Sequence, residues 1–198
     1  MLRSRTVKTL FVLFVAMLTG AMALLAMQTD PLLPPSGHLA ALAPSAGQDA
    51  AAIVRQTSVP LQPIKWRNIV VHSAECVDSN DRTSEVHFRL ASSADGEVTI
   101  QATQLWQQQA AGNHLPLIAG RDLNAESIGV CLAGELAEGE PSSRQLAQLR
   151  ALVRALQLAC SIPADHVYLH SDLDSHTGCP GRSFPSQRFS AGLIHGSR

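Results

Sequence analysis

The sequence lacks an excess of charge of either sign, because 15 Lys and Arg residues nearly balance 16 Asp and Glu residues. It also lacks any cluster of Lys or Arg interleaved with aromatic residues. A basic patch of that kind is the electrostatic footprint of nucleic-acid binding, so we expect no nucleic-acid partner. Internal repeats are absent as well, and 198 residues of which 45% are hydrophobic fit one globular domain with an appendage.

Long hydrophobic runs are absent after residue 27, so any membrane association depends on the N-terminal segment. Arg3, Arg5 and Lys8 precede an uncharged run over residues 9–27, whose length fits either a cleaved signal peptide or an uncleaved anchor. The basic flank predicts a cytoplasmic N-terminus and an exported remainder, in the periplasm or cell envelope, either released or anchored to the inner membrane. No Cys lies in this region, so a lipid-modified cysteine anchor is not supported.

Cysteine is scarce, with four residues in the whole chain: Cys76, Cys131, Cys160 and Cys179. In an exported protein a pair of cysteines commonly forms a disulfide. If Cys179 is instead a metal ligand, one disulfide and one buried thiol account for the other three. The sequence does not select the pair.

The composition divides the chain into three parts: 1–27, a signal peptide or signal anchor, 28–63, a Pro/Ala-rich tether, and 64–198, the folded domain. In the folded domain, strands are predicted at 69–71, 85–90, 97–102, 127–134 and 166–170. A Leu-rich segment at 143–160 has helical spacing, and Ser142 with Gln145 fits a capping box at its start. These elements predict an α/β fold with a central mixed β-sheet flanked by helices.

Three possible metal ligands lie in one turn-rich segment at residues 167–181, VYLHSDLDSHTGCPG: His170, His176 and Cys179. His72, which ends the apolar run NIVVH, is the partner we expect from a strand. A zinc ion held by three protein groups keeps a fourth position for water, as catalytic zinc sites do. The pattern therefore indicates a zinc hydrolase.

Several motifs together resemble one enzyme family. IVVHSA, HF with a following DG, NAESIGVCLAG, a long helix and HSDLDSHTGCPG are similar to the zinc-dependent N-acetylmuramoyl-L-alanine amidases, which include phage lysozyme-amidases and peptidoglycan recognition proteins. The resemblance covers roughly residues 66–184. It implies a mixed sheet flanked by helices and hydrolysis of the amide between N-acetylmuramic acid and L-alanine, with peptidoglycan or muramyl-peptide fragments as partner.

The resemblance also implies roles for individual residues. His72, His170 and Cys179 match the three zinc ligands of the family. Thr177 occupies the position of a residue that stabilises the developing oxyanion. His114 and Asn124 match residues of the substrate groove and of the N-x-x-S-I-G motif.

Two departures concern the general base of the reaction. Val86 stands where relatives have a Tyr that acts on the zinc-bound water, and Cys131 stands where another branch has a catalytic Glu. The usual base is therefore absent, and His87 is the candidate proton carrier, with Glu75, Asp172 and His176 as alternatives. Because of these two departures, the alternative function is that of a zinc-containing module that binds peptidoglycan without cutting it.

Overall fold

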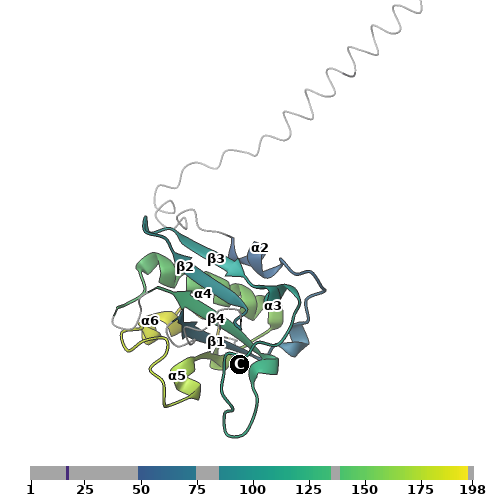
Figure 1. Ribbon diagram of the computed structural model, residues 1–198. Helices are drawn as coiled ribbons and strands as arrows, with labels where there is room; N and C mark the ends of the chain where they lie inside the picture. Colours follow the sequence, from purple (N-terminus) through teal and green to yellow (C-terminus); the bar gives the residue numbers. More distant parts are fainter. Residues whose placement is uncertain (1–16, 18–48, 75–84, 135–138, 196–198) are drawn as a thin grey trace, which may run out of the picture. The chain divides into compact units, whose positions relative to one another are not determined.

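The computed structural model describes residue 17 and residues 49–74, 85–134 and 139–195 (Figure 1). Residues 46–198 form one compact unit. No helix among the described residues is long and apolar enough to cross a bilayer. The apolar run at 9–27, apart from Met17, lies outside the described residues, as do Glu75 and Cys76.

A five-stranded mixed sheet in the order β3-β2-β4-β1-β5 forms the centre of the unit, which confirms the predicted α/β fold. Its strands are β1 (Asn68–Ser73), β2 (Phe88–Ser92), β3 (Val98–Ala102), β4 (Ser127–Ala133) and β5 (Val167–Leu169). The pairs β1–β4, β1–β5 and β2–β4 are parallel, and β2–β3 is the antiparallel hairpin that the Asp95-Gly96 turn predicts. Four parallel strands therefore end at one edge of the sheet.

The two faces of the sheet differ in composition because successive side chains of a strand point to opposite faces. Ile69 and Val71 of β1 belong to the hydrophobic core. His72 alternates with them and is paired in register with Cys131 of β4, so both side chains point to the other face. Functional groups thus gather on the face that the core does not use.

The predicted long helix is α4 (Ser143–Cys160), which lies across the core face (Figure 1). Its leucines supply much of that core: Leu146, Leu149, Leu152 and Leu156. The Ser142 hydroxyl accepts a hydrogen bond from the Gln145 N–H at 3.1 Å and so caps the helix. The Gln145 side chain does not complete the predicted box, because it donates to the Ala133 carbonyl instead.

The predicted tether is too long at its C-terminal end. Helix α2 (Ala50–Val54) is mostly buried and contacts α4 and β3. The Trp106 indole N–H donates to the Val54 carbonyl at 3.1 Å, and the Ser58 N–H donates to the Gln107 carbonyl. The folded unit therefore begins before Ile64, and the Ala-rich composition of this segment reflects a short helix that packs closely on α4.

Short helices complete the unit: η2 (Pro63–Lys65), α3 (Gln104–Gln107), η5 (Asn124–Glu126), η6 (Ala164–His166), α5 (His170–Leu173) and α6 (Ser186–Ser190). Helix α5 begins directly after β5, so its first residue lies at the edge where the parallel strands end.

Candidate active site

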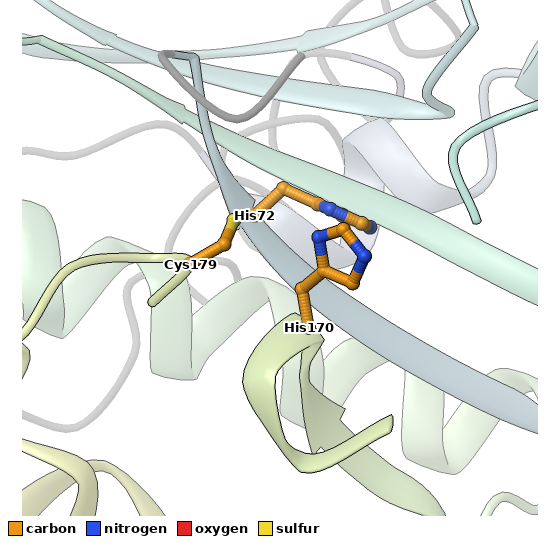
Figure 2. Close-up of side chains that lie close together, drawn as sticks. All are labelled: His72, His170 and Cys179. Atoms are coloured by element: carbon orange, nitrogen blue, oxygen red, sulfur yellow. The ribbon is translucent and has the colours of Figure 1, made fainter. Parts of the chain in front are cut away.

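Three side chains distant in sequence meet at the end of β1. His72 comes from β1 itself, and His170 opens α5 immediately after the neighbouring parallel strand β5. Cys179 lies in the following loop, which the Ser171 N–H ties to α5 by donating to the Cys179 carbonyl at 3.0 Å. One ligand atom from each lies within 4.8 Å of the others, and Figure 2 shows the three side chains lying close together.

The hydrogen bonding of this cluster fits a metal ion. His72 Nδ1 and both ring nitrogens of His170 are buried and have no hydrogen-bond partner among the described residues. Buried polar atoms of this kind are costly, and metal coordination removes the cost. The Ser73 N–H donates to Cys179 Sγ at 3.3 Å, which favours the thiolate. Two imidazoles and a thiolate are a donor set that zinc prefers.

The histidines of the cluster are neutral at neutral pH. Burial, reinforced by the neighbouring His114 and His170, holds the pKa of His72 well below its ordinary value. Burial also lowers the pKa of His170, although Asp174 opposes this shift. Because only the neutral imidazole binds a metal, these environments prepare both ligands for coordination.

The predicted groove residues His114 and Asn124 are both buried beside the cluster. His114 Nδ1 lies 3.1 Å from His72 Nε2. The side-chain oxygen Oδ1 of Asn124 accepts from the backbone N–H groups of His114 and Leu115, each at 2.9 Å. Asn124 thus holds the loop that carries His114, and contact of either residue with a substrate stays a prediction.

The contacts of His87 do not support its predicted role as proton carrier, which stays a prediction. Its side chain is fully buried, and Nδ1 accepts from the Gly129 N–H at 3.0 Å while Nε2 donates to the Ala110 carbonyl at 3.0 Å. Burial lowers the pKa of His87 to about 3. Both ring nitrogens are thus engaged with backbone groups, and His87 links β4 to the 110–113 segment.

Neither position of the expected general base offers one. Val86 and Cys131 are both fully buried, the first an apolar side chain and the second a thiol in register with His72. The absence of a Tyr or Glu at these positions therefore stands as a property of the site.

The loop between His170 and Cys179 is held by its own polar side chains. Thr177 Oγ1 accepts from the Cys179 N–H at 3.2 Å, which leaves its hydroxyl proton able to donate to another oxygen. Asp172 accepts from the Leu169 N–H at 2.8 Å and so caps α5. The catalytic role of Thr177 stays a prediction, whereas Asp172 has a structural role.

His176 is not a member of the ligand cluster and lies in the loop between His170 and Cys179. Asp174 Oδ1 accepts from both the backbone N–H and the Nδ1 of His176, each at 3.0 Å. The imidazole is 94% exposed. Together with residues 116–119 and Leu173, these two residues line a cavity of about 320 Å³.

Comparison with known proteins agrees with this site. Residues 60–182 match the model of the N-acetylmuramoyl-L-alanine amidase family. The endolysin N-acetylmuramoyl-L-alanine amidase LysCS from Clostridium intestinale URNW is 25% identical, with a TM-score of 0.51 over 68% of this chain and 88% of that one. No curated protein is significantly similar to the chain.

A more distant solved structure shares the fold. AmiD from E. coli, solved in complex with an anhydro-N-acetylmuramic acid peptide as substrate, is 19% identical, with a TM-score of 0.52 over 72% of this chain and 62% of that one. The family match covers all five strands of the sheet and all three members of the His–His–Cys cluster. The chain therefore belongs to the N-acetylmuramoyl-L-alanine amidase family, whose reaction is hydrolysis of the amide that joins N-acetylmuramic acid to L-alanine in peptidoglycan.

Proposed function

We propose that this amidase is zinc-dependent and that His72, His170 and Cys179 hold the ion. The observation that carries the proposal is a group of buried imidazole nitrogens that bond none of the residues the structure describes, beside a thiol that accepts a hydrogen bond from a backbone N–H. When bound, zinc would activate a water as nucleophile near neutral pH and polarise the amide carbonyl. The proposed substrate is a peptidoglycan strand or a muramyl-peptide fragment, the latter supported by the bound substrate of AmiD.

The remaining steps fall to other side chains of the site. Thr177 is placed within the loop of the ligand Cys179 and has a hydroxyl proton to donate to the amide oxygen as negative charge develops there. Cleavage of the C–N bond requires a proton for the departing amine of L-alanine. His114 and Asp172 already form hydrogen bonds within the protein, and both ring nitrogens of His87 bond backbone groups, so we do not assign this proton to them.

We infer that His176 moves this proton. Asp174 fixes its Nδ1–H, so Nε2 has the lone pair that accepts a proton and later returns it. The carboxylate also stabilises the imidazolium that forms in between. Asp174 itself stays ionised, because its hydrogen bonds from His176 hold the pKa of its carboxyl below the ordinary value.

Digestion of purified peptidoglycan by the full chain tests the proposed function. We expect stem peptides with a free L-alanine amine, detected by mass spectrometry, and we expect a chelator to stop their release until zinc is restored. The same digest with added inactive heat-treated protein is the control. If no peptide is released by a chain that carries one zinc, the binding module that recognises peptidoglycan without cutting it becomes the better account.

Replacement of His176 by glutamine tests the proton carrier. We expect kcat to fall by about 100-fold, the lower end of what general acid–base catalysis contributes, with zinc content unchanged. His195→Gln, at another exposed histidine whose Nε2 lies 3.3 Å from the Ser190 carbonyl, is the matched control. An unchanged kcat in His176→Gln would assign proton transfer to another group.

Export is the second part of the proposal. Residues 9–27 supply a signal peptide or an anchor, and either would deliver the folded unit to the compartment that contains peptidoglycan.

A further inference from the structure

The imidazole of His114 lies in a slot between two glycines. A Cβ atom at Gly129 would lie 2.8 Å from His114 Cδ2, and one at Gly112 would lie 2.8 Å from the same atom. Real Cβ atoms do not approach other atoms so closely, so neither position can carry a side chain while the ring stays in place. Asn124 holds the backbone of His114 at the same time. The ring is therefore fixed in position by its surroundings.

The Ser127 carbonyl fixes the direction of the hydrogen bonds that connect Ser127, His114 and His72. The Ser127 carbonyl can only accept, so His114 Nε2, 3.3 Å away, carries a proton and donates it. A neutral imidazole has one N–H, so His114 Nδ1 is an acceptor, and His72 Nε2 must be the donor to it at 3.1 Å. The lone pair of His72 is then on Nδ1, the nitrogen that has no hydrogen-bond partner in the described part of the chain.

We propose that His114 is a positioning residue that fixes the tautomer and the ring orientation of His72, so that zinc is bound through Nδ1. This inference rests on the proposed zinc dependence, and it gives His114 a role different from lining the substrate groove. Metal-bound histidines generally donate their second N–H to a fixed acceptor, and loss of that acceptor costs 10–100-fold in metal affinity. Here the acceptor is the neutral imidazole of His114, whose own N–H donates to the Ser127 carbonyl.

The nitrogen that binds zinc can be identified in the unaltered protein. In the zinc-loaded full chain with ¹⁵N-labelled histidine, we expect the NMR shifts of His72 to show a metal-bound Nδ1 and a protonated Nε2. Metal on Nε2 would overturn this inference alone. A chain that takes up no zinc would overturn both the inference and the proposed zinc dependence.

Two variants of similar shape separate positioning from packing. His114→Asn keeps an oxygen near the place of Nδ1 that can accept from His72, whereas His114→Leu fills similar space with no acceptor. We expect His114→Leu to weaken zinc binding by about 10–100-fold and His114→Asn to restore most of the loss. Unfolding of the metal-free variants measures any general loss of stability. Equal zinc affinity in His114→Leu and the native chain, or equal loss in the two variants, would contradict the proposal.

Discussion

Replacing Cys179 with alanine is expected to remove both bound zinc and amidase activity. A four-ligand zinc site contributes roughly 10–16 kcal/mol, so one protein ligand contributes about 3 kcal/mol, or at least about 100-fold in affinity. The change also removes the sulfur that accepts a hydrogen bond from the Ser73 N–H. Zinc per chain after dialysis against a weak chelator and release of L-alanine-terminated peptides are the two measurements.

Cys160 provides the matched control for this experiment. It is a buried thiol at the end of α4, it belongs to the hydrophobic core, and burial raises its pKa to about 11. Cys160→Ala should retain zinc and activity even if its stability falls, since a protonated thiol in the core is not a metal ligand. A Cys179→Ala variant that binds zinc as tightly as the native chain would show that the ion is held elsewhere.

Acid is expected to destabilise the metal-free protein steeply, starting well above the pH at which carboxylates are protonated. The pKa of His87 is about 3 when folded, against 6.5 for an ordinary histidine, so the unfolded chain binds a proton in this range that the folded chain excludes. The contribution of His87 to the free energy of unfolding is fully present above about pH 6.5. It falls by about 1.4 kcal/mol per pH unit as the pH drops toward 3. His114, whose pKa burial lowers to about 4, adds a similar loss over a narrower interval.

The contribution of His87 is identified by the slope of the free energy of unfolding against pH, rather than by the free energy at one pH. Denaturant unfolding between pH 6 and 4.5, with a chelator present, gives the free energy of unfolding at each pH. His87→Gln keeps a donor toward the Ala110 carbonyl but cannot be protonated, so its slope should be smaller by about 1.4 kcal/mol per pH unit although its stability at pH 7 is lower. A slope equal to that of the native chain would show that His87 accepts a proton in the folded state.

The elements with strong local patterns were predictable from the sequence. The all-apolar runs of β1 and β4 and the Leu spacing of α4 reflect burial that local residues alone determine, and the structure confirms all three. Helix α2 was missed because its Ala-rich segment follows a Pro-rich one and has no charged face. Its helical state depends on contact with α4 and Trp106, which lie far away in the sequence.

The site was predictable from the sequence only for those residues that belong to a recognisable motif. The HSDLDSHTGCPG segment led to His170 and Cys179, and the strand end led to His72, which the structure brings together. The role of His87 was not predictable, because its two partners are backbone groups from β4 and from the segment after α3. A histidine in a strand has the same local pattern whether its nitrogens are engaged or exposed.

The buried position of α2 has a mechanical consequence. A pull on the chain from its N-terminal side would reach α2 through Asp49, whose carboxylate caps this helix. The load then passes to α4, on the opposite face of the sheet from His72. Tension along a tethered chain would therefore be absorbed by helix packing, and the geometry of the His–His–Cys cluster would be spared.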